Sequence, residues 1–286
     1  MFGKTKTALE SHGLAPSKKR GQNFLVHQAT AQAIVDAASF NTDDHIIEVG
    51  VGLGALTVVL AHQVAGVIGI EIDRGIIEYH RQEKILPDNT QLLHQDILKT
   101  DFTSFSGLAT EPYKIISNLP YSISNPFIFK LIENKHLIEQ VVILLQKEVA
   151  DRLVAAPRTK EYGIPTVLLG SCATVTNLMR ISASEFHPQP KVESQLIRIV
   201  FDKNELSDDI CNIHRTIVRA AFSARRKTLM NNLLSSESLV SGNDKTERKT
   251  KILRIFESVG LSADIRAEAL TIEQFHRLAL SFADLR

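Results

Sequence analysis

The chain has 286 residues, of which 44% are hydrophobic and 23% are charged, a composition typical of globular proteins. Its two cysteines, Cys172 and Cys211, are far apart and lack metal-ligand spacing, which indicates a reducing compartment and predicts no metal site. No segment has the apolar length of a signal peptide or a membrane span, so we expect a soluble, cytoplasmic protein without membrane contact. The net charge of +1 argues against strong, generic nucleic-acid binding.

The charges are distributed unevenly along the chain. Residues 1–25 carry five Lys or Arg against one Glu, residues 26–205 carry fifteen against twenty-one acidic residues, and residues 206–286 carry thirteen against ten. Both ends are therefore basic and the middle is acidic. This segregation fits either a basic face that the total charge conceals or ordinary scatter of surface charge.

Between residues 45 and 146, short apolar runs alternate with segments that are compatible with helices. Strands are predicted at 45–51, 66–73, 91–98, 114–119 and 140–146, with helices at 55–63 and 74–86 and a further strand at 195–201. Runs that are so continuously rich in Ile, Val and Leu are typical of parallel strands buried on both faces. The alternation predicts an α/β protein with a doubly wound sheet.

Beyond about residue 205 the strand patterns stop and amphipathic helices follow. These helices are predicted at 208–222, 227–234, 246–259 and 271–285, and a polar linker is predicted at 235–245. The sequence therefore predicts two domains: an α/β domain at 1–205 and a small helical domain at 206–286.

The stretch EVGVGLGALT joins the first predicted strand to the first predicted helix. Its glycines, Gly50, Gly52 and Gly54, follow G-x-G-x-G, which permits a tight turn and close ligand approach but is not the G-x-G-x-x-G of dinucleotide sites. Glu71 ends the second strand, where a carboxylate could accept both hydroxyls of a ribose, and Asp96 follows the third, where it could read an adenine amino group. Ligands of open α/β sheets bind at these strand ends, so the set favours adenosine without a pyrophosphate, as in S-adenosylmethionine. Taken singly, Glu71 or Asp73 could be a solvated residue at the end of a strand.

The tetrad NLPY follows the fourth predicted strand at the same edge of the sheet. The Asn118 amide could accept a hydrogen bond from an exocyclic amine, while Leu119 and Pro120 form a stiff turn whose carbonyls could accept a second. Tyr121 offers a ring for stacking, and Phe186 in the loop FHPQPKVES could supply a second ring. Two acceptors on an adenine N6 would favour a tetrahedral nitrogen that attacks a methyl donor. The alternatives are a helix-capping turn for NLPY and an ordinary buried phenylalanine.

Eight stretches, in order along nearly the whole chain, carry a resemblance to a known family. They are KKRGQNFL, EVGVGLGALT, IEID, HQDIL, NLPYSISNPFIFKL, LLQKEVADRLVAAPRTKEYG, FHPQPKVES and AAFSARRKTLMNNL. The sequence resembles the ribosomal RNA adenine dimethyltransferases of the small-subunit type. That resemblance implies a Rossmann-like, S-adenosylmethionine-dependent methyltransferase sheet with a small C-terminal helical domain. It also implies N6,N6-dimethylation of two adjacent adenosines in a hairpin loop near the 3′ end of 16S rRNA, during biogenesis of the small subunit.

The resemblance also implies roles for particular residues. The S-adenosylmethionine contacts would be Asn23, Leu25, Gly50, Glu71, Asp96 and Asn118, to which the glycine loop adds Gly52. The adenine site would comprise Asn118, Tyr121 and Phe186. The sequence departs from the family pattern at Val51, where proline is usual, at Arg20 before GQNF and at Ser122 after NLPY.

The basic ends acquire an expected role from the same resemblance. We expect RNA phosphates to contact Lys18, Lys19 and Arg20 beside the cofactor site, and Arg219, Arg225, Arg226 and Lys227 in the helical domain. Arg219 and Arg226 are helix-spaced and could share a face. The alternative is a solvated helix face. Nothing in the sequence requires an oligomer, so we expect a monomer.

Four other functions remain as alternatives of lower weight. The macrolide-resistance methyltransferases of 23S rRNA are typically shorter and more basic, and the PKVES and SARRKT segments match the small-subunit type better. DNA N6-adenine methyltransferases favour DPPY over NLPY. A non-enzymatic assembly factor would show a degraded Glu71 or Asn118, and both are intact. A nicotinamide oxidoreductase is disfavoured by the glycine spacing.

Overall fold

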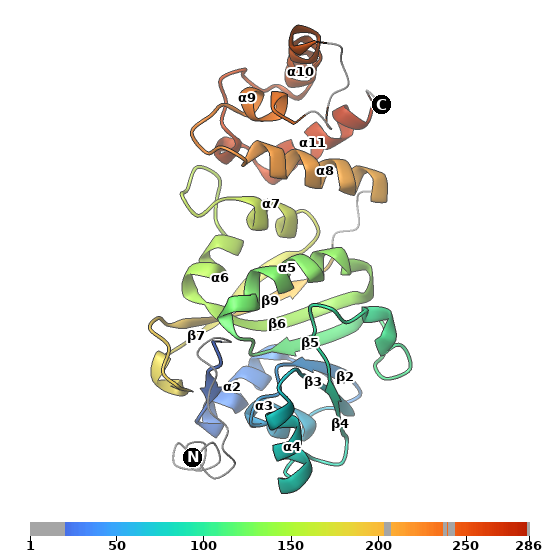
Figure 1. Ribbon diagram of the computed structural model, residues 1–286, viewed down its shortest axis with the longest axis vertical. Helices are drawn as coiled ribbons and strands as arrows, with labels where there is room; N and C mark the ends of the chain where they lie inside the picture. Colours follow the sequence, from blue (N-terminus) through green and yellow to red (C-terminus); the bar gives the residue numbers. More distant parts are fainter. Residues whose placement is uncertain (1–20, 203–206, 237–238, 240–243, 285–286) are drawn as a thin grey trace. The chain divides into compact units, whose positions relative to one another are not determined.

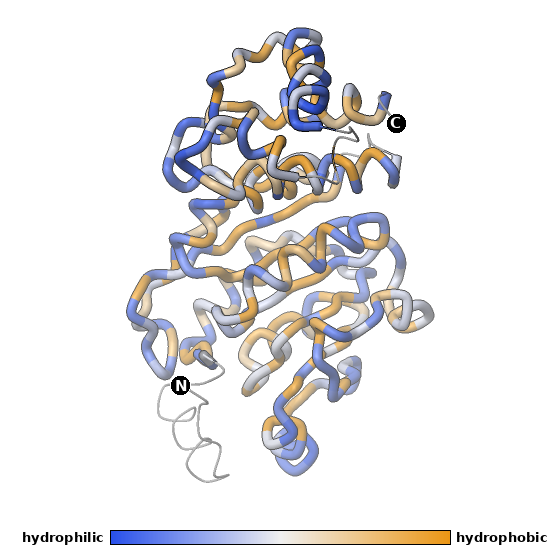
Figure 2. The backbone as a smooth tube through the Cα atoms, turned by 45° about the horizontal axis from the view of Figure 1, so that its top comes forward, coloured by the Kyte–Doolittle hydropathy of each residue, from blue (hydrophilic) through white to orange (hydrophobic). Residues whose placement is uncertain are grey.

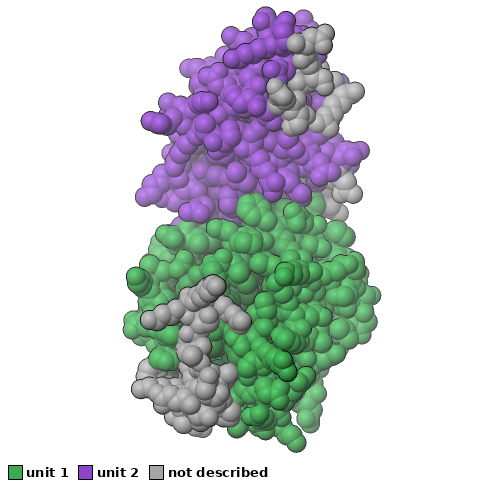
Figure 3. Space-filling model, viewed as in Figure 1, with its two compact units in different colours: residues 1–150, 174–202 green, residues 151–173, 203–286 purple. Residues whose placement is uncertain are grey.

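Figure 1 shows the computed structural model, which describes residues 21–202, 207–236, 239 and 244–284. The chain forms two compact units, coloured separately in Figure 3: residues 1–150 with 174–202, and residues 151–173 with 203–286. The second unit thus includes residues 151–173 as well as the residues after the boundary predicted at 205. The assignment of separate functions to residues 1–205 and 206–286 remains a prediction. Lys18, Lys19 and Arg20 lie outside the described residues.

A seven-stranded mixed sheet in the order β4-β3-β2-β5-β6-β9-β7 forms the centre of the first unit (Figure 1). Its strands are β2 (His45–Val49), β3 (Gly66–Glu71), β4 (Thr90–His94), β5 (Tyr113–Ser117), β6 (Ile138–Gln146), β7 (Thr174–Ile181) and β9 (Ser194–Val200). Strands β2 to β6 pair in parallel, whereas β9 pairs antiparallel with both β6 and β7. This confirms the predicted parallel strands, and β7 is a strand that the apolar pattern did not predict.

The apolar continuity of the central strands reflects burial on both faces of the sheet. Consecutive residues Val141, Val142 and Ile143 of β6 are all 0% exposed, although successive side chains point to opposite faces. One face packs against α2 (Gln28–Ala38) and α3 (Ala55–Ala61) in a single hydrophobic cluster. Figure 2 colours the backbone by hydropathy and shows apolar stretches within the helices and strands, with polar stretches in the turns between them.

Two further helices follow strands of the sheet. Helix α4 (Arg74–Glu83) begins after β3, where the Asp73 side chain accepts a hydrogen bond from the Gly75 N–H and caps the first turn. Helix α5 (Ser124–Glu133) begins directly after the short 3₁₀ turn at Tyr121–Ile123, and it buries Phe127, Ile128 and Leu131. The NLPY tetrad therefore lies between a strand and a helix, at the carboxyl edge of the sheet.

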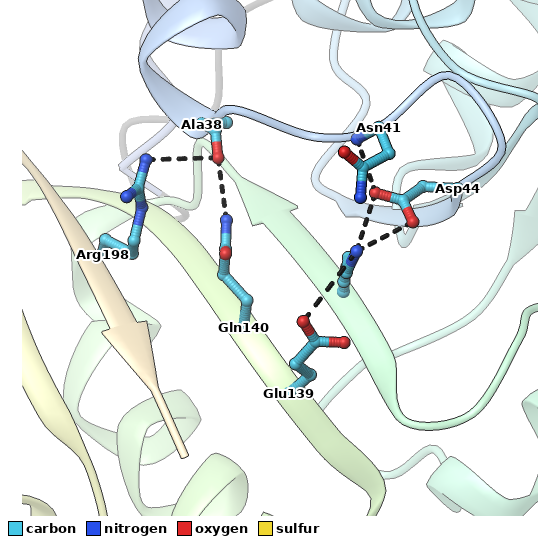
Figure 4. Close-up of polar contacts among 7 residues, drawn as sticks. Ala38, Asn41, Asp44, Glu139, Gln140 and Arg198 are labelled. Carbon is cyan, nitrogen blue, oxygen red and sulfur yellow. Dashed lines mark hydrogen bonds and ion pairs between the residues drawn. The ribbon is translucent and has the colours of Figure 1, made fainter. Parts of the chain in front are cut away.

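The C-terminal end of α2 is attached to the sheet by side chains from two strands (Figure 4). Gln140 Nε2 on β6 donates to the Ala38 carbonyl at 2.8 Å. Arg198 Nη2 on β9 donates to the carbonyls of Ala37 at 2.6 Å and Ala38 at 3.3 Å. These bonds satisfy carbonyls that the helix leaves without intrahelical partners, so they fix the helix over its sheet face.

A second polar cluster lies at the amino-terminal ends of the parallel strands (Figure 4). Lys114 Nζ on β5 donates to both Asp44 oxygens at 2.8 and 2.9 Å and lies 3.9 Å from Glu139. Because the Lys114 and Asp44 side chains are both 16% exposed, this pair is better shielded from water than a surface ion pair. It fixes the edge of the sheet opposite to the one that carries the candidate site.

The second unit is helical. Its helices include α7 (Ile164–Gly170), α8 (Asp208–Ala221), α9 (Leu229–Leu234), α10 (Lys245–Val259) and α11 (Ile272–Ala283), while α6 (Lys147–Leu153) begins in the first unit. The four C-terminal helices were all predicted, within two residues at each end. Phe222 stacks on Phe275 at 5.9 Å and contacts the Tyr162 ring at 6.1 Å in the core of this unit. No helix among the described residues is long and apolar enough to span a membrane.

Candidate active site

A cavity of about 620 Å³ lies at the carboxyl ends of the parallel strands in the first unit. Its walls come from the segment after residue 21, the glycine loop, and the residues that follow β3, β4 and β5. Of the residues predicted to form the site, those that line it are Asn23, Leu25, Gly50, Gly52, Glu71, Asp96, Asn118, Leu119 and Pro120. The structure therefore brings all seven predicted cofactor residues to one cavity.

Gly50 allows the glycine loop to lie directly against the NLPY segment. Its φ of 84° is in the left-handed region, and a Cβ there would lie 3.2 Å from the Asn118 carbonyl oxygen. The Gly50 N–H donates to the Ile70 carbonyl at 2.9 Å, while the Ser117 hydroxyl donates to the Val49 carbonyl at the same distance. Only glycine fits this combination of backbone conformation and contact.

The Gly52 peptide is held by polar side chains on both sides. Its N–H donates to Glu71 Oε2 at 3.0 Å, and its carbonyl accepts from His80 Nε2 at 2.7 Å. Burial lowers the pKa of His80, so the ring is neutral and carries its proton on the nitrogen that faces the carbonyl. A Cβ at Gly52 would lie 3.1 Å from the Phe24 ring, which closes the loop against the N-terminal segment.

Glu71 is a buried carboxylate that organises the backbone around the cavity. In addition to Gly52, it accepts hydrogen bonds from the N–H groups of Ile72 and Asp73, both at 2.9 Å to Oε1. Burial raises its pKa, and these three backbone bonds act against that shift. A carboxylate has about four acceptor positions, so these bonds leave room for one further donor.

Asp96 lies after β4 in a more open part of the cavity wall. Its Oδ1 accepts from the Leu98 N–H at 3.0 Å, and Oδ2 lies 3.9 Å from Lys99 Nζ. The side chain is 28% exposed. Because only one oxygen accepts a close hydrogen bond from the backbone, the carboxylate keeps acceptor capacity for a ligand.

Asn118 connects the NLPY segment to the N-terminal motif. Its Nδ2 donates to the Asn23 carbonyl at 3.4 Å, and Asn23 Nδ2 in turn donates to the Gly21 carbonyl at 3.0 Å. With the amide nitrogen oriented toward Asn23, the Asn118 oxygen is the atom that could accept from a ligand. The Pro120 carbonyl accepts from the Ile123 N–H at 3.1 Å and is thereby engaged in the following turn.

Tyr121 is held at the edge of the site by its hydroxyl group. The hydroxyl lies 2.6 Å from Ser194 Oγ, and Ser194 is fully buried at the start of β9. Burial raises the pKa of Tyr121, with the Ser194 hydrogen bond opposing the shift. Tyr121 is half-buried and is not among the residues that line the cavity, although its neighbours Pro120 and Ser122 are.

Phe186 occupies a different position from the one predicted. Its side chain is 1% exposed, belongs to the hydrophobic cluster under α2 and α3, and is not among the residues that line the cavity. The reason is strand pairing: β8 (Phe186–His187) pairs antiparallel with β1 (Phe24–Leu25), which places Phe186 opposite Leu25. The FHPQP and GQNFL motifs therefore lie side by side, as parts of one small sheet.

Sequence reasoning missed several residues of the cavity wall, among them Ile72, Ile97 and Glu48. Ile72, directly after Glu71, is 48% exposed and gives the wall an apolar surface, and Ile97 follows Asp96. Their positions beside the two predicted acids could have indicated them. Glu48 in β2 also lines the cavity although it is 0% exposed, and its position inside a strand predicted to be buried on both faces could have indicated it.

The basic residues of the helical unit are exposed, but they do not form the predicted helical face. Arg219 lies in α8, whereas Arg225, Arg226 and Lys227 lie in the turns after that helix ends at Ala221. Helix spacing therefore does not relate Arg219 to Arg226. Arg225 Nε lies 3.1 Å from Glu268 Oε2, so one of the four cations is already paired with a carboxylate.

The sheet order, with a ligand-sized cavity at the carboxyl ends of its parallel strands, defines a Rossmann-like methyltransferase. A solved structure described as a dimethyladenosine transferase from Plasmodium falciparum has this fold, with a TM-score of 0.76 at 26% identity over 92% of this chain and 98% of that one. The 23S rRNA methyltransferase ErmE is also similar in fold, with a TM-score of 0.65 at 21% identity over 91% of this chain and 99% of that one.

The chain belongs to the family described as ribosomal RNA adenine dimethylase, whose sequence model matches residues 15–284. It is 49% identical to the ribosomal RNA small subunit methyltransferase A of Desulfotalea psychrophila, over 98% of this chain and 96% of that protein. It is also 37% identical to the protein of the same description from Geobacillus kaustophilus, over 99% of this chain and 96% of that one.

Proposed function

We propose that this protein is an S-adenosylmethionine-dependent enzyme that dimethylates N6 of two adjacent adenosines in a hairpin loop near the 3′ end of 16S rRNA, during biogenesis of the small ribosomal subunit. The family and the descriptions of its full-length relatives support an rRNA small-subunit adenine methyltransferase. The observation that carries the proposal is the convergence of Glu71, Asp96 and Asn118 on one cavity, each at the carboxyl end of a different parallel strand.

The residues of the cavity fit S-adenosylmethionine. A volume of about 620 Å³ is within the range of small-molecule sites, which is roughly 300–1,000 Å³. Glu71 would accept a ribose hydroxyl with its remaining acceptor position, and Asp96 would accept from the adenine amino group. Ile72 would cover the apolar face of the purine. Gly50, Gly52, Asn23 and Leu25 would surround the amino-acid end of the cofactor.

The chemistry assigned to the NLPY segment concerns the lone pair of the adenine amine. The cofactor supplies an electrophilic methyl group on a sulfonium centre. Adenine N6 is a poor nucleophile because its lone pair is delocalised into the ring. Acceptors at the Asn118 side-chain oxygen and the Leu119 carbonyl would bind the two N6 hydrogens and favour a pyramidal nitrogen. The rigid Pro120 turn would keep these acceptors aligned with the donor.

Of the two aromatic residues predicted to stack on the target base, only Tyr121 lies beside the cavity wall. Tyr121 lies next to the cavity wall, and its hydroxyl bond to Ser194 fixes the ring, so it would provide one stacking face for an extruded base. The Phe186 side chain is buried, so it would have to leave its core position to provide the second face. We therefore assign Phe186 first to packing beneath the site.

RNA phosphates are the proposed partners of the exposed cations in the helical unit. Arg219, Arg226 and Lys227 would neutralise phosphates without reading sequence, while Arg225 would have to exchange Glu268 for RNA. The same role for Lys18, Lys19 and Arg20 rests on the sequence alone. We propose a monomer acting on the small subunit or its precursor.

The experiment is radiolabelled methyl transfer to under-methylated 30S particles, followed by nucleoside analysis. Wild type is expected to form dimethyladenosine on 30S but not on 50S particles, which separates this function from methylation of 23S rRNA. Glu71→Ala and Asn118→Ala are expected to fall to background while they remain folded. Exposed Asn125 in α5 provides a matched control, Asn125→Ala, which should keep wild-type activity. Full activity of Asn118→Ala, or transfer to 50S particles, would refute the proposal.

A further inference from the structure

His80 is a buried histidine of α4 that the proposed mechanism does not use. Its side chain is 4% exposed, and its Nε2 lies 2.7 Å from the Gly52 carbonyl oxygen. Its Nδ1 is buried without a hydrogen-bond partner among the described residues. Because a carbonyl oxygen only accepts, Nε2 is the nitrogen that carries the proton. A polar ring is thus buried at this position with its donor directed at the glycine loop.

Helix α4 fixes the position of His80 relative to the cavity. Ile76, four residues earlier in the helix, lines the cavity, so the ring lies on the helix face that borders it. The ring also packs against the glycine loop, because a Cβ at Gly54 would lie 3.2 Å from His80 Cε1. The same helix is capped by Asp73, whose N–H donates to Glu71. His80 and Glu71 therefore belong to one rigid segment of the chain.

Gly52 connects His80 to one particular oxygen of Glu71. The Gly52 carbonyl accepts from His80, and the Gly52 N–H donates to Glu71 Oε2 at 3.0 Å. The other carboxylate oxygen, Oε1, accepts from the N–H groups of Ile72 and Asp73. With about two acceptor positions on each oxygen, Oε1 is filled and Oε2 keeps one position open. The oxygen that remains for a ligand is the one whose backbone partner is held by His80.

We infer that His80 is a positioning residue for the ribose of the cofactor, because it holds Gly52 so that Glu71 Oε2 faces a ribose hydroxyl group. This inference rests on the proposed function and adds a residue that acts through two successive hydrogen bonds. Without His80, the Gly52 carbonyl would lose its donor, and a rotation that found another would turn the Gly52 N–H away from Oε2. The proposed contact of Asp96 with the adenine amino group does not depend on these bonds.

The neutral state of the ring suits this role. Burial lowers the pKa of His80, and the hydrogen bond to Gly52 opposes that shift. A protonated ring would need a second acceptor at Nδ1, and the described residues provide none. At about neutral pH, His80 is therefore an uncharged donor that fixes the loop without adding a charge beside Glu71.

The test is calorimetric titration with S-adenosylhomocysteine and with its 2′-deoxy and 3′-deoxy analogues. His80→Met keeps an unbranched side chain but cannot donate, whereas His80→Gln places an amide N–H near the position of Nε2. Wild type should bind the parent ligand about tenfold or more tightly than at least one analogue, because the analogue leaves a charged acceptor unpaired. His80→Met should reduce this preference to about threefold or less, and His80→Gln should restore most of it.

The matched control is His62→Met. The His62 ring also contacts a backbone carbonyl, that of Val58 at 2.6 Å, but it is exposed and is not among the residues that line the cavity. This variant should keep the preference of wild type. An equal preference in wild type and folded His80→Met, or an equal loss of affinity for all three ligands, would overturn the inference. Wild type that binds none of the ligands would instead refute the proposed function.

A second measurement needs only wild type, in case His80→Met does not fold. Protein labelled with ¹⁵N at histidine should show a slowly exchanging Nε2–H for His80, because this group is buried and bonded to Gly52. Saturation with S-adenosylhomocysteine should slow the exchange further, and the analogue that binds more weakly should slow it less. Equal exchange rates with the parent ligand and both analogues would contradict the inference.

Discussion

A Cβ added at Gly50 would lie 3.2 Å from the carbonyl oxygen of Asn118, so the backbones of the glycine loop and the NLPY segment are in close contact. This contact joins the part of the cavity proposed for the cofactor to the part proposed for the target base. The Asn118 side chain extends the connection to the Asn23 carbonyl of the N-terminal motif. Three motifs that are separated in the sequence thus depend on one close packing arrangement.

Gly50→Ala should therefore lower both stability and cofactor affinity. The added methyl group meets the Asn118 carbonyl in a backbone conformation that already disfavours alanine, and the combined cost is about 2–3 kcal/mol of unfolding free energy. Gly107 provides the matched control, because its φ is 80° and nothing lies within 4 Å of its Cβ position. Gly107→Ala should lose only about 1 kcal/mol in denaturant unfolding. Equal losses in both variants would show that the contact is unimportant.

Replacement of Asn118 should separate chemistry from folding. Asn118→Ala removes the proposed amide acceptor, and the rate of methyl transfer should fall by about 100-fold or more. The free energy of unfolding should change by less than about 1 kcal/mol, because the hydrogen bond to Asn23 is long at 3.4 Å. Single-turnover kinetics and chemical denaturation measure the two effects. A large loss of stability with an unchanged rate would assign Asn118 a structural role.

Tyr121 allows the hydroxyl and the ring to be tested separately. Tyr121→Phe leaves the buried Ser194 hydroxyl without this partner and should cost about 1–2 kcal/mol of stability, while the ring and most of the activity remain. Tyr121→Ala removes the ring as well and should weaken the binding of the RNA substrate. If Tyr121→Ala retained the KM of wild type for 30S particles, the proposed stacking role would be wrong.

Glu48 makes stability depend on pH. Its pKa is about 8 in the folded protein and 4.5 in the unfolded chain, so the folded state retains the proton over that interval. The unfolded state binds fewer protons there, and stability must fall as pH rises from about 5 to 8, by roughly 3 kcal/mol in total. Glu48→Gln should remove this slope, so it should be more stable than wild type at pH 8 and close to it at pH 5. Urea unfolding at both pH values measures the difference. If the stabilities of wild type and Glu48→Gln changed equally with pH, the pKa of Glu48 would not be raised in the folded protein.

The sequence was sufficient to predict the central parallel strands because their burial on both faces gives them a continuously apolar composition. Val141, Val142 and Ile143 leave little alternative to a buried strand. Strand β7 was missed for the opposite reason, since it lies at the end of the sheet order and only Ile181 among its residues is buried. An edge strand with polar side chains lacks the apolar signal on which the prediction relied.

The candidate site was predictable where a strand end fixed the position of a residue, and less so where packing determined it. Glu71, Asp96 and Asn118 each lie at the carboxyl end of a parallel strand, so topology alone brings them to one edge. Phe186 follows no such rule, and its pairing opposite Leu25 buries the ring. Glu48 was overlooked although it lies inside a strand that was predicted to be buried on both faces, where an acid is unusual.

The central claim is that the cavity at the strand ends binds S-adenosylmethionine through Glu71. Its most direct test is calorimetric titration of wild type, Glu71→Gln and the control Glu78→Gln, whose side chain is 52% exposed on α4. Wild type and Glu78→Gln should bind with equal affinity, while Glu71→Gln should bind at least about tenfold more weakly, because it loses a charged acceptor. Unchanged affinity in a folded Glu71→Gln protein would contradict the account.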